Sequence, residues 1–410
     1  MAEINFKSTV LLLLFIGLSC LHSKPQSKRE LVTEGSLLTQ PDITLGISQT
    51  ALYFPHLKNK RIGIATNHSS LIFKEGKPQH LVDFLIANNF NVTTLFAPEH
   101  GFRGTADAGK TIENQTDAKT GLPIISLYGK HKKPLPTQLK NIDILVFDIQ
   151  DVGVRFYTYI STLHYLLEAC AENQIPIIVL DRPNPNAHYI DGPVLETAHQ
   201  SFVGMHPVPV VYGMTIGEYA RMIVGENWLS TSQTPELTVI PLKNYNHKTP
   251  YNLPVKPSPN LPNARAVNLY PSLCFFEGTP ISAGRGTSLQ FQVFGAPQLP
   301  DSLYNFSFTP KPNIGAQYPK FNGEVCVGKN LENTAFLSEI NLEWLIEAYS
   351  HWPVDNPPFF NAFFTKLAGT HTLQKQIENG YTAKAIKASW QDALNTFKNI
   401  RTKYLLYPED

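Results

Sequence analysis

Carboxylates and arginines gather at a few places in this 410-residue chain, in groups that suit acid–base chemistry. The groups contain Glu99, Asp148, Asp151, Asp181 and Glu277, together with Arg103, Arg155, Arg182 and Arg285. Pairs of carboxylates are the usual means of glycoside hydrolysis, in which one protonates the leaving oxygen and the other acts as base or nucleophile. Arg, Asn and Tyr side chains would hold sugar hydroxyls or a substrate carboxylate. These residue types therefore favour chemistry on a glycoside.

Other chemistries lack their usual signatures. The sequence contains no G-x-S-x-G elbow of a serine hydrolase, no H-E-x-x-H zinc motif and no G-x-G-x-x-G. With 34 Lys+Arg against 33 Asp+Glu, the formal net charge is +1. The chain therefore lacks the positive excess that a nucleic-acid binder needs. We predict no cofactor, no metal site and no nucleic-acid partner.

Strands and helices are predicted to alternate in the first 240 residues. Short apolar or β-branched runs predict strands at 61–66, 91–96, 123–127, 143–147, 175–180 and 237–241. Helical spacing of apolar residues predicts helices at 80–89, 156–170 and 215–228, with a helical turn at 136–141. Strands whose apolar runs do not alternate are covered on both sides. The pattern therefore predicts an α/β fold, with a mainly parallel sheet and helices on both faces.

Polar clusters follow directly after four of the predicted strands. They are Asn67-His68, Glu99-His100, Asp148-x-x-Asp151 and Asp181-Arg182-x-Asn184. In open α/β sheets, ligands bind outside the carboxyl ends of the strands. One such cluster is an ordinary loop, whereas four rich in acids, amides and His predict a site.

The texture of the sequence changes after about residue 245. Five prolines fall within residues 249–263, and a loop-rich stretch with Gly284-Arg285-Gly286 follows. Helices are predicted at 342–352, 364–379 and 383–398, the second with Gly380 as its C-cap. We predict an N-terminal domain at 45–255 and a smaller α+β domain at 256–410.

The N-terminus has the pattern of an export signal. Val10 to Leu18 is an apolar run preceded by Lys7, too short to span a bilayer. Cys20 stands where a bacterial lipoprotein carries its lipid, which would anchor the protein to a membrane. We predict a signal peptide at 1–20, a polar tether at 21–44, and a periplasmic or cell-surface location. The alternative is an ordinary cleaved secretory signal.

Eight segments of the chain form a distinctive series of motifs: FAPEHGFRG (96–104), GLPIISLYG (121–129), VFDIQDVGVRFYTYISTL (146–163), VLDRPNP (179–185), SFVGMHPVPVVYGMTIGE (201–218), PSPNLP (257–262), EGTPISAGRGT (277–287) and RTKYLLY (401–407). With these segments the chain resembles one protein family, the NamZ family of bacterial exo-β-N-acetylmuramidases, formerly known as a domain of unknown function. The resemblance implies a Rossmann-like N-terminal domain, a smaller C-terminal domain and a cleft between them. It also implies release of N-acetylmuramic acid from the non-reducing ends of peptidoglycan fragments.

The resemblance places the family's proposed catalytic glutamate on Glu99. We predict Glu277 as its partner, with Asp151 as second choice, and His100 as either a direct participant or a residue that orients Glu99. The predicted substrate-binding residues are Asn67, Arg103, Asp148, Arg155, Tyr157, Asp181, Arg182, Asn184, Asn260 and Arg285. Arg155 and Arg285 are the candidates to pair with the lactyl carboxylate of muramic acid. Many members have Glu just before the GRGT motif, where this chain has Ala283.

Several alternatives remain open at this point. Asp148 and Asp151 are also suited to cap the following helix, and Asp151 to pair with Arg155. His68, Glu99, His100, Asp148 and Asp151 would instead suit a metal-dependent hydrolase. A non-catalytic sugar-binding lipoprotein also fits export, a tether and two domains. Retaining, inverting and substrate-assisted mechanisms differ in geometry that the sequence does not contain.

Overall fold

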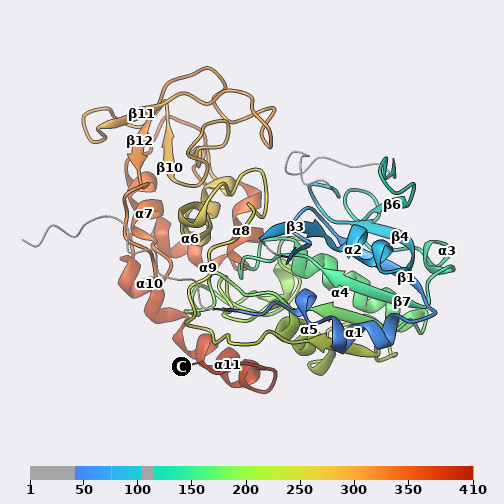
Figure 1. The fold of residues 1–410 in the computed structure, drawn as a ribbon. Coiled ribbons are helices and arrows are strands. Elements are labelled where there is room, and N and C mark those ends of the chain that lie inside the picture. Colours follow the sequence, from blue (N-terminus) through green and yellow to red (C-terminus); the bar gives the residue numbers. More distant parts are fainter. Residues whose placement is uncertain (1–41, 75, 103–114, 410) are drawn as a thin grey trace, which may run out of the picture. The chain divides into compact units, whose positions relative to one another are not determined.

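A mainly parallel, seven-stranded sheet forms the centre of the first half of the chain in the computed structural model (Figure 1). The structure describes residues 42–74, 76–102 and 115–409, which belong to one unit, Gln40–Asp410. The strand order is β5-β6-β4-β1-β7-β8-β9, and every neighbouring pair is parallel except β5 with β6. The strands are β1 (Arg61–Thr66), β4 (Asn91–Ala97), β5 (Gln115–Thr116), β6 (Pro123–Ser126), β7 (Ile144–Asp148), β8 (Ile177–Leu180) and β9 (Leu237–Ile240).

The six parallel strands have the order of the Rossmann fold. Numbered along the chain, they run third, second, first, fourth, fifth, sixth across the sheet. The strand predicted at each of the six positions is present, so the predicted Rossmann-like sheet is confirmed. The order reverses between β1 and β7, which is where such sheets bind their ligands.

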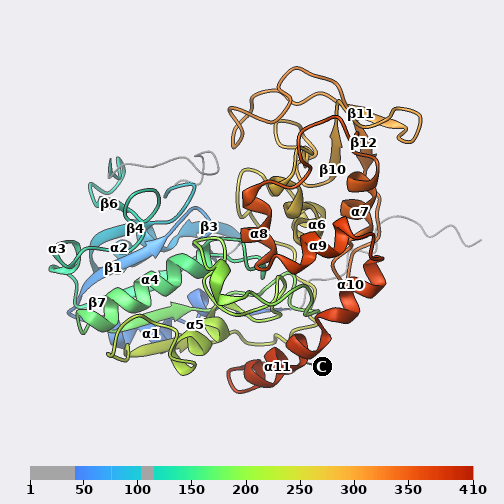
Figure 2. The same ribbon diagram turned by 180° about the vertical axis from the view of Figure 1, so that it is seen from behind.

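Helices cover both faces of this sheet, because alternate strand residues point to opposite sides (Figures 1 and 2). In β7, Ile144 and Val146 belong to the apolar cluster that contains the buried sides of α1 and α2. Leu145 and Phe147 belong to the cluster that contains α4 and α5. The helices in sequence order are α1 (Thr50–Leu57), α2 (Leu81–Ala87), α3 (Pro136–Leu139), α4 (Tyr159–Glu172) and α5 (Ile216–Gly225).

The second half combines helices with a small antiparallel sheet of order β10-β12-β11. In Figures 1 and 2 this sheet lies at the end of the second half that is farthest from the seven-stranded sheet. The elements are α6 (Ala264–Leu273), the 3-10 helix η3 (Cys274–Gly278), β10 (Val293–Ala296), β11 (Phe306–Phe308), β12 (Cys326–Asn330), α7 (Glu343–Ser350), α8 (Ala362–Ala368), α9 (Thr372–Glu378), α10 (Ala383–Ser389) and α11 (Gln391–Thr402). The predicted smaller C-terminal α+β part is therefore present, whereas the boundary near residue 255 stays a prediction.

Two long C-terminal helices predicted from the sequence are each broken in two. The predicted helix 364–379 divides into α8 and α9 because Gly369 adopts φ 75° and ends α8, its N–H donating to Thr365 O. The predicted helix 383–398 divides into α10 and α11 at Trp390, which leaves helical geometry with ψ near 0°. Apolar spacing continues across both breaks, which is why the sequence pattern did not reveal them.

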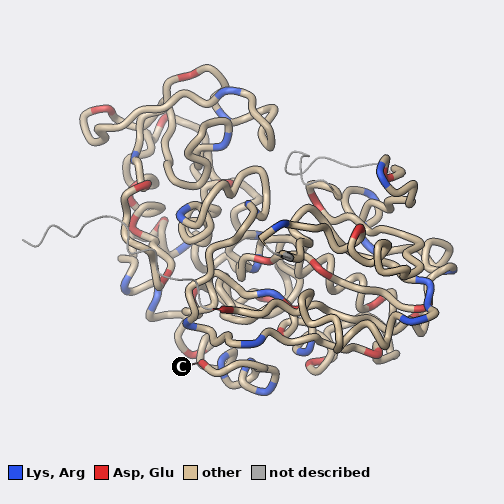
Figure 3. The backbone as a smooth tube through the Cα atoms, in the orientation of Figure 1, with Lys and Arg blue, Asp and Glu red and all other residues tan. Residues whose placement is uncertain are grey.

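Smaller elements connect this framework. They are η1 (Gly46–Ser48), the hairpin of β2 (Leu71–Lys74) and β3 (Lys77–His80), and η2 (Thr197–His199). Cys170, Cys274 and Cys326 are buried free thiols. Among the described residues, no helix has the length and apolar character that crossing a membrane requires. Basic and acidic residues are interspersed along the described backbone (Figure 3).

Candidate active site

The strand order brings together the polar clusters that the sequence places after the strands. β4, β1, β7 and β8 are consecutive neighbours, and the pairs among them are all parallel. Their carboxyl ends lead into Glu99-His100, Asn67, Asp148 and Asp181 respectively. Neighbouring parallel strands end at the same edge of a sheet, so these clusters meet at the β1–β7 switch point.

A pocket of about 270 Å³ lies at this edge and is shared by the two halves of the chain. Glu99, His100 and Tyr128 line it from the sheet side, and Asn260, Glu277 and Arg285 line it from the second half. Aromatic and aliphatic side chains, among them Phe291, complete its wall. The two carboxylates predicted as a catalytic pair thus face one cavity, as the expected cleft between the halves requires.

A tight turn after β4 presents Glu99 to this pocket. His100 and Gly101 have φ of 70° and 75°, and Gly101 N–H donates to Pro98 O at 2.9 Å. Two successive residues with positive φ reverse the chain directly after the strand, and Gly101 adopts that conformation without a Cβ clash. The turn thereby fixes the backbone position of Glu99.

Two hydroxyl groups hold the Glu99 carboxyl. The Thr158 hydroxyl, just before α4, donates to Glu99 Oε2 at 2.7 Å. The Tyr128 hydroxyl, just after β6, also hydrogen-bonds with Glu99. Burial and the neighbouring Glu99 carboxyl group raise the pKa of Tyr128, which keeps this phenol protonated. The carboxyl group is therefore oriented by residues from two separate elements.

Glu277 is held in its ionised form by two cations. It lies in η3 and accepts a hydrogen bond from Arg285 Nε at 3.0 Å. Burial opposes ionisation, but the charges of Arg285 and Lys320 outweigh it and hold the pKa of Glu277 below its ordinary value. Lys320 is fixed there because its ammonium group donates to three backbone carbonyls of residues 276–281. Glu277 is therefore suited to act as a base or nucleophile.

Of the predicted substrate-binding arginines that lie among the described residues, Arg155, Arg182 and Arg285, only Arg285 lines this pocket. Its guanidinium carbon lies 5.0 Å from the centre of the Phe291 ring. Its Nε is engaged by Glu277.

Arg155 is enclosed rather than exposed to the pocket. Its side chain is fully buried, and its two terminal nitrogens donate to the carbonyls of Pro193, Val208, Leu367 and Ala368 at 2.7–2.9 Å. Four carbonyl acceptors use the donors that a substrate carboxylate would need. Arg155 therefore joins the two halves of the chain, and the expectation that it contacts substrate does not fit its position.

The four polar residues after β7 and β8 brace the sheet edge from within. Asp148 and Arg182 form a buried ion pair, with Arg182 Nη2 donating to Asp148 Oδ2 at 2.9 Å. Asp181 accepts from Thr215 Oγ1 and Tyr407 OH, and burial raises its pKa to about 7. Asn184 Nδ2 donates to Met214 O at 2.9 Å. None of Asp148, Asp181, Arg182 or Asn184 lines the pocket. All four instead stabilise the loops at the carboxyl edge of the sheet through buried hydrogen bonds.

Asp151 is likewise directed into the protein. Its Oδ2 accepts from Gly153 N–H at 2.7 Å and from the Tyr212 hydroxyl. Burial raises the pKa of Asp151 to about 6. It neither lines the pocket nor pairs with Arg155, whereas Glu277 lines the pocket together with Glu99.

Asn67 and Tyr157 connect the sheet to the second half. Asn67 Nδ2 donates to Tyr159 OH at 3.0 Å, so Asn67 fixes the start of α4 rather than the pocket surface. Tyr157 donates to Pro257 O at 2.9 Å while its side chain lines the pocket. Of these two predicted binding residues, the structure places only Tyr157 in the pocket. Arg103 and Cys20 lie outside the described residues.

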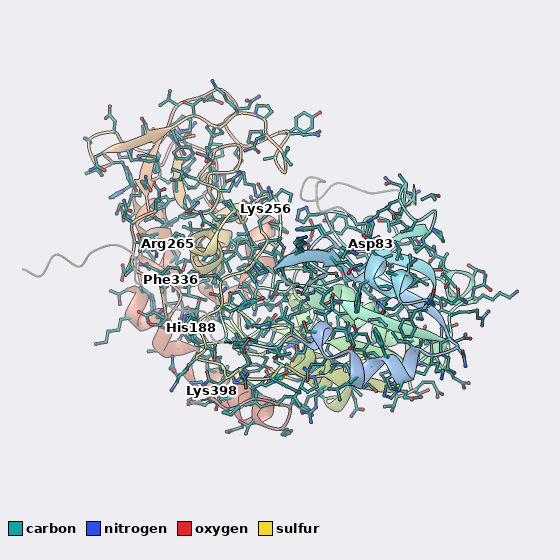
Figure 4. The ribbon with its side chains drawn as sticks, viewed as in Figure 1. Asp83, His188, Lys256, Arg265, Phe336 and Lys398 are labelled. Atoms are coloured by element: carbon teal, nitrogen blue, oxygen red, sulfur yellow. The ribbon has the colours of Figure 1, made fainter. Side chains whose placement is uncertain are left out.

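The described part of the chain contains no cluster of side chains that would support the alternative of a metal site. No group of three or more His, Cys, Asp or Glu side chains there has metal-binding geometry. His68 is engaged instead in a hydrogen bond between its Nε2 and Lys256 O, at 2.7 Å. Figure 4 labels Lys256, which lies where the chain enters the second half.

Sequence reasoning missed Tyr128, Thr158 and Lys320. Tyr128 follows the strand predicted at 123–127, so the rule that found Glu99 would also have found it. Thr158 precedes the helix that follows Asp148-x-x-Asp151, but a lone Thr there carries no signal. Lys320 lies 43 positions beyond Glu277 in the numbering, and nothing in the sequence relates the two.

Known proteins are similar to this chain in both sequence and fold. The model of the exo-β-N-acetylmuramidase NamZ N-terminal domain matches residues 62–265, and that of the NamZ C-terminal domain matches residues 268–407. The chain is 38% identical over 421 residues to the peptidoglycan β-N-acetylmuramidase NamZ of Bacillus subtilis (strain 168), covering 97% of each.

Two crystal structures of DUF1343 family proteins from Bacteroides fragilis NCTC 9343 are also similar. One has a TM-score of 0.82 and 48% identity, covering 90% of this chain and 100% of that one. The other has a TM-score of 0.73 and 31% identity, covering 89% and 99%. The fold described above is therefore that of these solved relatives.

Proposed function

Because this chain belongs to the NamZ family of exo-β-N-acetylmuramidases, we propose that it hydrolyses the β-glycosidic bond of N-acetylmuramic acid at the non-reducing end of peptidoglycan fragments. The observation that carries the proposal is the convergence of Glu99 and Glu277, from two halves of the chain, on one pocket beside Arg285. Two carboxylates at one cavity are what glycoside hydrolysis requires. The partners are peptidoglycan-derived disaccharides or muropeptides.

The two carboxylates divide the chemistry by their surroundings. Glu99 is oriented by neutral hydroxyl groups and would donate its proton to the glycosidic oxygen as the bond to the anomeric carbon breaks. Glu277 is kept ionised by Arg285 and Lys320. It would either take a proton from the attacking water or attack the anomeric carbon itself. The product anomer, read by proton NMR immediately after turnover, distinguishes inversion from retention.

Recognition of the lactyl carboxylate falls to Arg285. Muramic acid differs from glucosamine by this group, and a guanidinium binds a carboxylate through charge-assisted hydrogen bonds. Arg155, the other candidate, is enclosed by four carbonyls, whereas Arg285 lines the pocket. Arg285 would thereby give preference for muramyl over glucosaminyl ends.

Turnover of a chromogenic β-N-acetylmuramide tests the proposal directly. The purified chain should release the chromophore from this glycoside faster than from the β-N-acetylglucosaminide, before and after exhaustive chelation. Saturable binding without turnover would instead make it a sugar-binding protein. Loss of activity on chelation, restored by metal, would make it a metal-dependent hydrolase.

We also propose export and lipid anchoring through Cys20, supported by the apolar run from Val10 to Leu18 that precedes it. In the producing cell, Cys20→Ala should abolish incorporation of labelled fatty acid and leave unprocessed precursor. Normal processing of that variant would show an ordinary secretory signal instead.

A further inference from the structure

One residue that lines the pocket has a buried polar atom without a hydrogen-bond partner among the described residues: Oδ1 of Asn260. Asn260 lines the pocket and is only 2% exposed. A buried acceptor without a donor is destabilising, and native proteins contain few of them. Because this one belongs to a pocket-lining residue, a donor on the substrate is the natural partner.

The orientation of the Asn260 amide is fixed by its other end. Nδ2 donates to Gly315 O at 2.8 Å. Since a carbonyl oxygen only accepts, the atom facing Gly315 must be the nitrogen, and the oxygen must face the other way. Asn313 and Ala316 exchange two backbone hydrogen bonds of 3.1 Å around Gly315, which holds that turn in place. A flip of the amide would therefore break a bond to an anchored loop.

We infer that Asn260 Oδ1 accepts a hydrogen bond from the acetamido N–H of the sugar whose bond is cleaved. The inference rests on the proposed function and adds the residue that recognises the 2-substituent. An amide N–H donates and accepts nothing, so it matches an acceptor whose own Nδ2 is already engaged. Apolar neighbours in the pocket, including Leu261, provide a surface for the acetyl methyl group.

The inference predicts discrimination between an amide and its ester. Replacing the acetamido N–H by oxygen gives a 2-O-acetyl glycoside of nearly the same shape. In the wild-type pocket its ester oxygen would face Asn260 Oδ1, so that neither atom has a donor. Leaving a buried group unpaired in this way corresponds to a loss of roughly 5- to 150-fold in kcat/KM.

The test compares two substrates in two enzymes. The chromogenic β-N-acetylmuramide and its 2-O-acetyl counterpart are assayed with the wild type and with Asn260→Leu. Any difference in intrinsic reactivity, including loss of participation by the acetamido group, affects both enzymes alike and cancels in the ratio of ratios. The amide-to-ester preference of the wild type should fall at least roughly fivefold in the variant.

Asn268→Leu is the matched control. Asn268 is also a buried asparagine of the second half, but Leu337 satisfies both ends of its amide, and it does not line the pocket. This variant should lose stability and keep the wild-type preference. Asn260→Ala replaces Asn260→Leu if the larger side chain prevents folding. Calorimetric binding of N-acetylmuramic acid and its 2-O-acetyl analogue reports the same preference for variants that turn over slowly.

The outcomes distinguish a failure of the role of Asn260 from a failure of the proposed glycosidase function. An unchanged amide-to-ester preference in a folded Asn260 variant overturns the role of Asn260 and leaves the glycosidase intact. Turnover of neither substrate by the wild type overturns the proposed function and this inference with it. A fall in preference in Asn260→Leu but not in Asn268→Leu supports the inference.

Discussion

Substitution of Glu99 by Gln removes the proposed proton donor and almost nothing else from the site. Gln keeps an oxygen that can accept the 2.7 Å hydrogen bond from the Thr158 hydroxyl. The turn made by His100 and Gly101 is a backbone feature and does not depend on the carboxyl group. Glu99→Gln should therefore fold with a melting temperature within about 2 °C of the wild type, since 1 kcal/mol shifts the Tm of larger domains by only about 2–4 °C.

The expected kinetic loss is large. General acid–base catalysis contributes roughly 10²- to 10⁴-fold, which corresponds to about 2.7–5.4 kcal/mol of barrier at 1.36 kcal/mol per factor of ten. The kcat of Glu99→Gln on a simple β-muramyl glycoside should fall by at least that lower factor. Glu172→Gln, an outer position on α4 paired with Lys133, is the control and should keep wild-type kcat.

The leaving group shows whether Glu99 acts as the acid. A dinitrophenyl leaving group departs with little protonation, so the loss in Glu99→Gln should shrink with that substrate and remain full with a sugar leaving group. A folded Glu99→Gln variant that retains more than a tenth of wild-type kcat on a substrate with a sugar leaving group would remove Glu99 from the mechanism. A loss of equal size for every leaving group would refute its role as the acid.

Three further predictions concern the charges around the site. Because Arg285 and Lys320 hold the pKa of Glu277 below its ordinary value, activity that needs ionised Glu277 should persist as pH falls until that lowered pKa is reached. Arg285→Met should move this acid limb of the kcat/KM profile to higher pH, because the variant lacks a cation that lowers the pKa of Glu277. An acid limb at the wild-type pH would contradict its assignment to Glu277. Arg182→Leu leaves buried Asp148 unpaired and should cost about 3–5 kcal/mol of unfolding free energy by urea denaturation; a loss below about 1 kcal/mol would show that the pair is not stabilising. Burial raises the pKa of Asp181 to about 7, so its contribution to stability is present below about pH 4 and is lost as pH rises toward 7. Asp181→Asn should flatten the wild-type decline in unfolding free energy across that range, and an identical pH dependence in the two proteins would count against this origin.

Local patterns in the sequence determined the framework of the first half. Uninterrupted apolar runs such as Ile144 to Phe147 identified strands that are covered on both faces, because a parallel sheet between two helical layers buries both sides of its strands. The polar residues that follow those runs indicated that the site lies at the carboxyl edge of the sheet, and Glu99 lines the pocket at that edge. Breaks inside apolar helical patterns were invisible, as at Gly369 and Trp390, because the spacing continues through them.

Only the tertiary structure decided which polar residues face the pocket. Asp151 and Asp181 belong to polar clusters that follow predicted strands, as Glu99 does, and Arg155 lies just beyond Asp151, yet none of the three lines the pocket. Each has a partner that is distant in the sequence: Tyr212 donates to Asp151, Arg155 donates to Ala368 O, and Tyr407 donates to Asp181. Likewise Glu277 and Glu99 line one pocket only because the second half packs against the carboxyl edge of the sheet. Residue type and strand position are local properties that a sequence encodes directly. Whether a charge binds substrate or braces the fold depends on which distant carbonyl or hydroxyl reaches it, and only the assembled chain sets that distance.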